Sequence, residues 1–119
     1  MSDREQLIKQ ITKKLQHVSE KQYENGRSLS EKEQAEQDFF EMKSHFRRLF
    51  NRLFDVWHQD KGLSNWLEQK QLELQHYERK IDHELENNKA RLLQEKRQLN
   101  DLENDLYYQR KSLVKGGEE

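Results

Sequence analysis

A row of leucines seven residues apart is the feature that most limits how this chain can fold. Leu85, Leu92, Leu99, Leu106 and Leu113 repeat at this spacing, and no proline interrupts the 119 residues. Such a row lies along one side of a long α-helix, where it forms a narrow apolar seam that another helix must cover. A seam between two helices is an interaction surface and not an enclosed pocket, so the spacing favours binding over catalysis.

The composition is typical of a long helix or a coiled coil. Only 31% of the residues are hydrophobic and 38% are charged, with 22 basic side chains against 23 acidic ones. A two-helix seam needs only about two apolar residues in every seven, which this content supplies. Because β-branched residues are scarce and no strand-length alternation occurs, we expect an all-α protein, an elongated antiparallel two-helix hairpin that is coiled-coil-like.

Charge, cysteine content and hydropathy favour a soluble protein. The formal net charge is −1 and there is no cysteine, which suits a reducing compartment. The first residues lack the apolar stretch of a signal peptide, and no window approaches the roughly 20 apolar residues that span a bilayer. We therefore expect a cytoplasmic location without membrane insertion, and we leave open export together with a partner.

Two stripes of residues at helical spacing predict the faces that the two helices turn toward each other. The first stripe is Ile8, Ile11, Leu15, Val18, Gln22, Asn25, Leu29, Lys32, Glu36, Phe39, Lys43, Phe46, Phe50, Leu53 and Trp57. The second stripe is Leu63, Leu67, Lys70, Leu74, Tyr77, Ile81, Leu85, Asn88, Leu92, Glu95, Leu99, Leu102, Leu106, Gln109 and Leu113.

A turn signal separates the two stripes. Gly62 suits the position just after a helix end, and Ser64 suits an N-cap. We therefore predict a single domain over residues 1–119, with a first helix over about 3–60, a turn over about 61–64 and a second helix over about 64–115.

The first stripe weakens between Gln22 and Glu36, where two interpretations stay open. The pair Asn25-Gly26 is a turn signal and residues 28–33 contain two capping-box patterns, so a break near Asn25–Ser28 is one interpretation. The other is a continuous helix, which we favour because a single glycine costs a helix only about 1 kcal/mol relative to alanine.

The second helix has its own polar positions level with this weak stretch. Antiparallel pairing places Asn88 and Glu95 opposite it. There Lys32 and Glu36 would meet Glu95 and Asn88, which would fix the register of the helices at some cost in stability.

The segment 38–57 carries more apolar surface than one neighbouring helix can cover. It contains all five phenylalanines and one of the two tryptophans. Its apolar side chains span about 200° of the helix surface, whereas one neighbour buries little more than about 100°. Phe40 and Phe54 extend past one edge of the contact, and Leu49 and Val56 extend past the other. Large exposed apolar surfaces with aromatic anchors are typical of protein interfaces.

We therefore predict a partner-binding surface near the bend, and a weaker second candidate near the end of the second helix. The predicted residues are Phe39, Phe40, Phe46, Leu49, Phe50, Phe54, Val56, Trp57, Trp66, Tyr107 and Tyr108. The alternative is that the rings only close the end of the hairpin by packing on Trp66, Leu67 and Leu74. A homodimer would cover the surplus surface as well as a foreign chain would.

The chain shows no motif for catalysis or metal binding. His76 and His83 are seven residues apart, which does not match the i, i+4 spacing of helical zinc sites. The four glycines form neither a phosphate loop nor a nucleophile elbow. Arg47, Arg48 and Arg52 are interleaved with acidic residues, so we expect no nucleic-acid partner. We expect no metal, no cofactor and no enzymatic activity.

The chain resembles small α-helical proteins of type VII secretion. The bend, from Trp57 to Gly62 and followed by Trp66, resembles that of the WXG-type proteins, although it departs from their compact Trp-x-Gly motif. The segments Phe46-Arg47-Arg48-Leu49-Phe50 and Leu106-Tyr107-Tyr108-Gln109-Arg110 are similar to those of the targeting chaperones of LXG toxins in Gram-positive type VIIb systems. This resemblance spans most of the chain.

The resemblance implies a non-enzymatic targeting chaperone or adaptor. It would bind the helical N-terminal domain of an LXG-type toxin, together with a sister small helical protein. The Tyr-x-x-x-Asp/Glu export signal of type VII substrates follows none of the four tyrosines, which implies that the partner supplies it. The alternative function is structural, as a coiled-coil or stalk-like protein that associates with itself.

Overall fold

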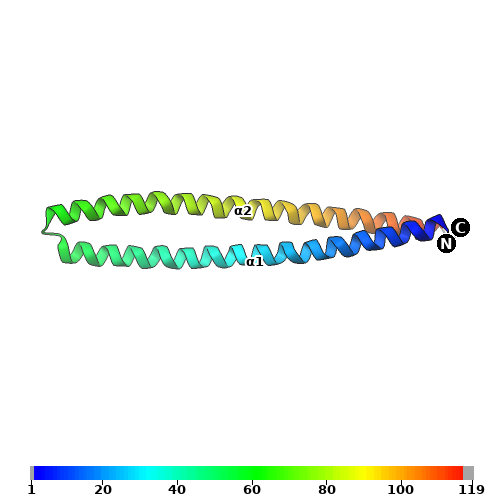
Figure 1. Cartoon of the computed structure of the whole chain (residues 1–119), viewed down its shortest axis with the longest axis horizontal. Helices are drawn as coiled ribbons and strands as arrows, with labels where there is room; N and C mark the ends of the chain where they lie inside the picture. Colours follow the sequence, from blue (N-terminus) through cyan, green and yellow to red (C-terminus); the bar gives the residue numbers. More distant parts are fainter. Residues whose placement is uncertain (1, 117–119) are drawn as a thin grey trace. The chain divides into compact units, whose positions relative to one another are not determined.

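The computed structural model describes residues 2–116, and these form two antiparallel α-helices. Helix α1 runs from Asp3 to Trp57 and helix α2 from Lys61 to Gly116. Figure 1 shows the two helices joined by one short connection. The described residues contain no strand. The prediction of an all-α antiparallel hairpin is confirmed.

Helix α1 continues through the stretch where a break was the alternative. Residues 25–28 are helical, and Gly26 has no positive φ angle. Asn25 and Leu29 are buried on either side of Gly26, so packing holds the helix together across its weakest residue. The continuous helix is confirmed, and a break near Asn25–Ser28 is wrong.

The connection lies three residues earlier than the sequence predicted. Helix α1 ends at Trp57 and not near residue 60, and residues 58–60 form the turn instead of 61–64. Gly62 lies in the first turn of α2 without a positive φ angle, so it does not act as a C-terminal cap. The N-cap of α2 is Asp60, because its Oδ1 accepts a hydrogen bond from the backbone N–H of Leu63 at 3.1 Å.

Ser64 has a different role from the predicted N-cap. Its Oγ donates a hydrogen bond to the backbone carbonyl of Trp57 at 3.1 Å. The backbone N–H of Asp60 donates to the same carbonyl, also at 3.1 Å. The last carbonyl of α1 therefore accepts hydrogen bonds from residues at the bend. It needs them because no further turn of α1 follows to donate a backbone N–H.

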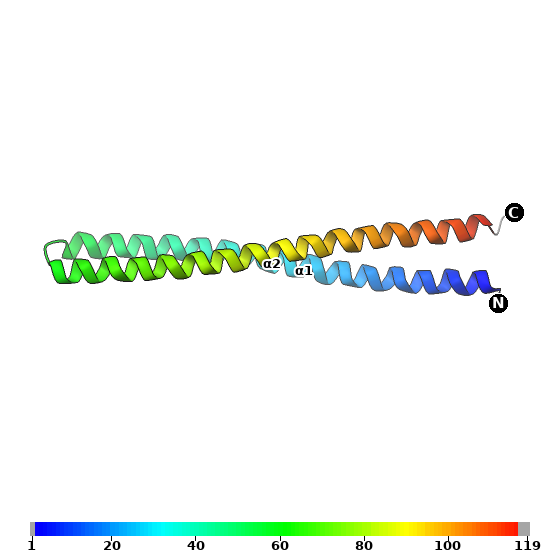
Figure 2. The same ribbon diagram turned by 90° about the horizontal axis from the view of Figure 1, so that it is seen from above.

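The chain divides into two compact units. Unit 1 contains described residues 2–30 and 90–116, so the N-terminal part of α1 packs on the C-terminal part of α2, which Figure 2 shows in blue and orange. Unit 2 contains residues 31–89, including the bend. The core of unit 1 is formed by Ile11, Leu15, Val18 and Leu106, with Leu99 and Leu113 packed against it. In unit 2 the buried apolar residues are Phe39 and Leu67.

The predicted contact face of α1 agrees with the structure. All fifteen positions of the first stripe except Trp57 are buried or half-buried. The contact face of α2 differs from the prediction, because seven of the fifteen positions of the second stripe are exposed. These seven are Leu63, Lys70, Tyr77, Ile81, Glu95, Leu102 and Gln109.

Helix α2 is rotated about its axis relative to the predicted seam. Leu99 and Leu106 lie in the contact, but Leu102, three residues after Leu99, is exposed. Glu103 lies four residues after Leu99, and Arg110 lies four residues after Leu106. Both are half-buried, so they take the places beside α1 that were predicted for Leu102 and Gln109. The same pattern occurs in unit 2, where Glu78 and Asp82 are half-buried and Ile81 is exposed. Apolar side chains of α2 are therefore left uncovered by α1 in both units.

Two polar contacts explain this rotation. In unit 1 the Nδ2 of Asn25, which is buried, donates to the backbone carbonyl of Leu92 at 2.9 Å. In unit 2, Glu36 pairs with Lys89, at 3.4 Å between Oε2 and Nζ, and not with Asn88 as predicted. The Glu36–Lys89 pair holds a polar edge of α2 against α1, and the Asn25 hydrogen bond fixes where α1 meets the backbone of α2, because charged and amide groups are rarely left buried without partners.

Candidate partner-binding surface

The phenylalanines of segment 38–57 mostly lie in the contact between the helices of unit 2. Phe39 is buried, with the Nζ of Lys43 at 4.8 Å from its ring centroid. Phe46, Phe50 and Phe54 are half-buried. For these four rings the structure agrees with the alternative interpretation, in which aromatic residues close the end of the hairpin.

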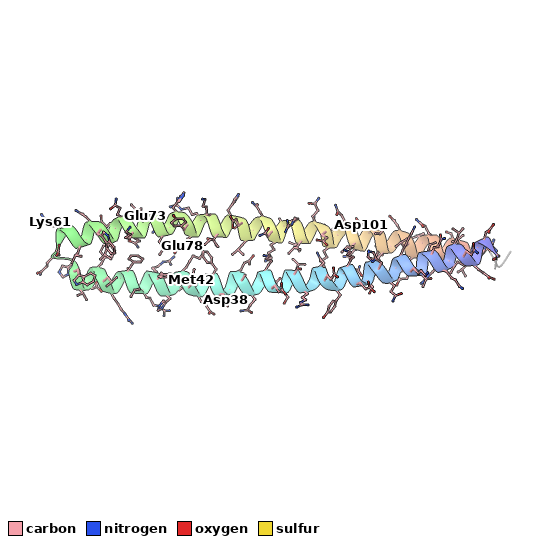
Figure 3. The ribbon with its side chains drawn as sticks, viewed as in Figure 1. Asp38, Met42, Lys61, Glu73, Glu78 and Asp101 are labelled. Carbon is pink, nitrogen blue, oxygen red and sulfur yellow. The ribbon has the colours of Figure 1, made fainter. Side chains whose placement is uncertain are left out.

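One face of unit 2 carries ion pairs between the helices. Lys43 pairs with Asp82 at 3.0 Å, and Lys89 pairs with Glu36 at 3.4 Å. A groove on this face has a volume of about 70 Å³, which is far below the several hundred Å³ of typical ligand pockets. It is lined by Lys43, Phe46, Arg47, Phe50, Gln71, Leu74, Gln75 and Glu78. Figure 3 shows Glu78 in the space between the two helices. We call this side of unit 2 the ion-pair face.

The opposite face of unit 2 follows from helix geometry. Successive residues turn by about 100°, so Leu49 lies about 120° around α1 from Lys43, on the other side of the contact. Likewise Tyr77 lies about 140° around α2 from Asp82, across the contact from the ion pair. Exposed side chains of both helices therefore meet on one side, away from the ion pairs.

This opposite face carries exposed apolar residues on both helices. Its α1 residues, Met42, Leu49 and Val56, are 43%, 42% and 71% exposed and lie seven residues apart. We define the apolar face of unit 2 as Met42, Leu49 and Val56 of α1 with Leu63, Trp66, Tyr77 and Ile81 of α2, all of which are exposed.

The ion pairs also fix which residues of the apolar face are level with each other. Because Lys43 is level with Asp82 and the helices are antiparallel, Met42 is level with residue 83 and lies within about one helical turn of Ile81. Counting along both helices from this pair, Leu49 lies across from Tyr77. Val56 lies across from Trp66 within about one helical turn. The face therefore consists of apolar pairs that run across the groove between the helices.

The exposed residues among those predicted for the surface near the bend divide between three places. Leu49, Val56 and Trp66 lie on the apolar face. Phe40 is 62% exposed, but it lies about 60° beyond Lys43 on the side of the ion-pair face. Trp57 is 38% exposed and lies beside the bend.

Four residues of this face were not among those predicted for the partner-binding surface. These are Met42, Leu63, Tyr77 and Ile81. The spacing of Met42, Leu49 and Val56 was a usable signal, because three apolar residues seven apart form a second row on the same helix. Tyr77 and Ile81 gave no such signal, since the rotation of α2 decides whether they are covered.

The second candidate, Tyr107 and Tyr108, belongs to unit 1. Tyr107 is 48% exposed, with the guanidinium of Arg110 at 5.1 Å from its ring centroid. Tyr108 is 76% exposed and lies about 160° around α2 from the buried Leu106. Tyr108 thus points away from the helix contact of unit 1, whereas Tyr107 lies about 100° around α2 from Leu106, at the side of this contact.

The described part of the chain shows no arrangement of groups for metal chemistry. Among residues 2–116, no three His, Cys, Asp or Glu side chains gather closely enough to hold a metal ion. The helices of this same range contain no stretch long and apolar enough to cross a membrane.

The fold and surface define an antiparallel helical hairpin with an exposed apolar face on unit 2. Comparison with protein families identifies it further. The chain belongs to the family described as "Protein of unknown function (DUF3958)", whose model matches residues 6–113. Searches of curated proteins and of solved structures gave no match.

Proposed function

We propose that this protein is a non-enzymatic adaptor that binds long helices of a partner through the apolar face of unit 2. The observation that supports it is the separation of the two sides: seven exposed apolar residues lie on one side, and the two ion pairs that join the helices lie on the other. On the apolar side, Lys70 pairs with Glu73 of its own helix and lies 5.8 Å from the centroid of the Trp66 ring. Exposed apolar residues scattered singly need no explanation, but a contiguous group on one side of two helices is typical of an interface.

The partner segment on this face is a helix. A groove between two antiparallel helices accepts a third helix by ridge-into-groove packing, and amphipathic helices bind such grooves through apolar residues three and four apart. Trp66 near the bend and Tyr77 in the middle of the face supply large aromatic surfaces, and such residues are common anchors of interfaces.

We further propose that the partner is the helical N-terminal domain of an LXG-type toxin, bound with a sister small helical protein for type VIIb secretion. This part rests on the resemblance of the bend and of the aromatic segments to LXG-toxin targeting chaperones. The adaptor and the toxin would together present the surface that the secretion machinery recognises. The rival function, a structural protein that only associates with itself, predicts no binding to such a domain.

The test is co-purification with the N-terminal domain of an LXG-type toxin encoded beside the gene of this protein. Leu49→Glu combined with Trp66→Glu places two charges on the apolar face, and both side chains are already exposed. We expect helicity to be retained and affinity to fall about thirtyfold or more, as for interface anchors worth about 2 kcal/mol.

Two further variants locate the surface. Leu72→Glu is the matched control, because Leu72 is 66% exposed in the same helix but lies about 120° around α2 from Trp66. We expect it to leave affinity unchanged. Phe40→Glu tests the other edge of α1. If only Phe40→Glu abolishes binding, the partner surface lies at that edge of α1. If binding survives Leu49→Glu with Trp66→Glu, and also survives Phe40→Glu, the proposal is contradicted.

A further inference from the structure

Unit 1 contains an open apolar groove that the proposed function does not use. Its volume is about 300 Å³, and its floor is formed by Val18, Leu102 and Leu106. The basic side chains of Lys13 and Lys14 lie along its α1 side together with His17. The groove therefore has an apolar floor and a basic edge.

Leu102 stands in this groove without cover from α1. It is 46% exposed, although it belongs to the second stripe, which was predicted to face α1. Its neighbour Glu103 takes the half-buried place beside α1 instead. An exposed leucine beside an open apolar groove leaves room for an apolar side chain of another molecule.

The two edges of the groove carry opposite charges. Lys14 lines the α1 edge, and Lys21 lies seven residues further along the same edge. Asp105 and Asp101 lie about 60° and 100° around α2 from Leu102, both on the side turned away from α1, and Figure 3 labels Asp101 on this helix. These four side chains are exposed, and within residues 2–116 none of them takes part in an ion pair.

The four charges also lie at matching heights along the unit. The Nε2 of Gln22 donates to the Oδ1 of Asn100 at 3.1 Å, so residues 22 and 100 are level. Since the helices are antiparallel, Lys21 is level with Asp101. By the same count, Lys14 is level with Asp105 within about one helical turn.

We infer that the groove of unit 1 binds the same groove of a second copy of this chain. A two-fold axis parallel to the helices places α2 of the second copy over α1 of the first. Leu102 of each copy then lies over Val18 of the other and fills the groove. Lys14 then faces Asp105 of the second copy, and Lys21 faces Asp101, twice over by symmetry.

Charge complementarity selects both the occupant and its direction. A two-fold axis perpendicular to the helices would place α1 over α1 and α2 over α2, so that lysines would face lysines and aspartates would face aspartates. Like charges placed opposite each other cost free energy, whereas alternating edges favour association. In the parallel two-fold arrangement, the α1 segments of the two copies of unit 1 therefore run in the same direction.

This inference is independent of the proposed function. It uses the residues of unit 1, whereas the proposed partner surface lies in unit 2. A dimer without toxin binding, or toxin binding without a dimer, would separate the two.

The first experiment is sedimentation equilibrium of the full chain at low ionic strength, where exposed ion pairs are least screened. We expect a monomer–dimer equilibrium whose dissociation constant rises with salt. Leu102→Glu should weaken the dimer about tenfold or more, because the charge enters an apolar contact. Leu93→Glu is the matched control, since Leu93 is 39% exposed on the same helix and lies about 180° around it from Leu102.

The second experiment exchanges the charges. Lys14→Glu with Lys21→Glu should dissociate the dimer, and so should Asp101→Lys with Asp105→Lys. Mixing the two variants should restore a dimer that contains one copy of each, because every edge then meets its opposite again. A wild-type chain that stays monomeric at all concentrations overturns the inference. So does a dimer that Leu93→Glu weakens as much as Leu102→Glu, or swapped variants that fail to pair.

Discussion

Gly26 lies in the middle of α1, yet nothing in the structure requires a glycine there. The position is exposed, it has no positive φ angle, and a Cβ atom would meet nothing within 4 Å. Glycine loses more backbone freedom on folding than any other residue, so its presence in a helix weakens that helix.

We predict that Gly26→Ala raises the free energy of unfolding by about 0.5–1 kcal/mol. Urea denaturation followed by circular dichroism measures the change. A decrease in stability would show that α1 bends at this residue in solution, because only a bent backbone would need the freedom of glycine.

At the bend, one aspartate holds the start of α2. We predict that Asp60→Ala lowers the free energy of unfolding by about 1 kcal/mol, since the hydrogen bond from its Oδ1 to the N–H of Leu63 is lost. Asp60→Ser should recover most of this loss, because serine is an equally good N-cap. Equal effects of the two substitutions in thermal denaturation would show that the cap contributes nothing.

At the scale of the helices, the single buried amide of α1 sets how α2 faces it. Asn25 is 3% exposed, and its Nδ2 donates to the carbonyl of Leu92. That carbonyl already accepts a helical hydrogen bond within α2, so the amide adds direction more than stability. A buried asparagine in a coiled coil fixes the register at a cost in stability.

We therefore predict that Asn25→Leu raises the denaturation midpoint but loosens the register of the helices. Amide resonances from unit 1 should then appear as more than one set in a nitrogen–proton correlation spectrum. Asn25→Ala, which adds no apolar surface, is the comparison and should lower the midpoint. If Asn25→Leu lowers the midpoint as well, the hydrogen bond contributes more than the burial of a leucine.

At the scale of the whole molecule, the two units have separate cores on shared helices. Each part of a helical hairpin contacts only its neighbours along the helices. Its stability is therefore a sum of local contributions, as in repeat proteins. Both tryptophans, Trp57 and Trp66, lie in unit 2. Tryptophan fluorescence therefore reports on unit 2, whereas circular dichroism reports on both units.

We predict that Leu106→Ala separates these two signals. It removes a core side chain that is 4% exposed in unit 1, at a cost of about 2–5 kcal/mol. The circular dichroism transition should begin at a lower temperature, while the fluorescence transition stays near its original midpoint. Leu67→Ala in unit 2, where Leu67 is fully buried, should shift the fluorescence transition. If both substitutions shift both signals equally, the hairpin unfolds as one cooperative unit.

The spacing of residues along the chain predicted the all-α hairpin and the face that α1 turns toward α2, and it favoured a continuous α1 without deciding it. These features depend on helical periodicity and backbone propensity, which are properties of one segment and its spacing. The row from Ile11 to Phe50 could therefore be recognised as the contact face of α1 without knowledge of its partner.

The rotation of α2 about its axis could be seen only in the folded hairpin. This rotation sets which apolar residues of α2 are exposed. That rotation depends on polar contacts between the helices, such as Asn25 with Leu92 and Lys43 with Asp82. Contacts between residues so far apart in the chain leave no periodic signal in either helix. The sequence showed surplus apolar surface on both edges of α1, but the rotation of α2 placed Tyr77 and Ile81 on the side of Leu49 and not on the side of Phe40.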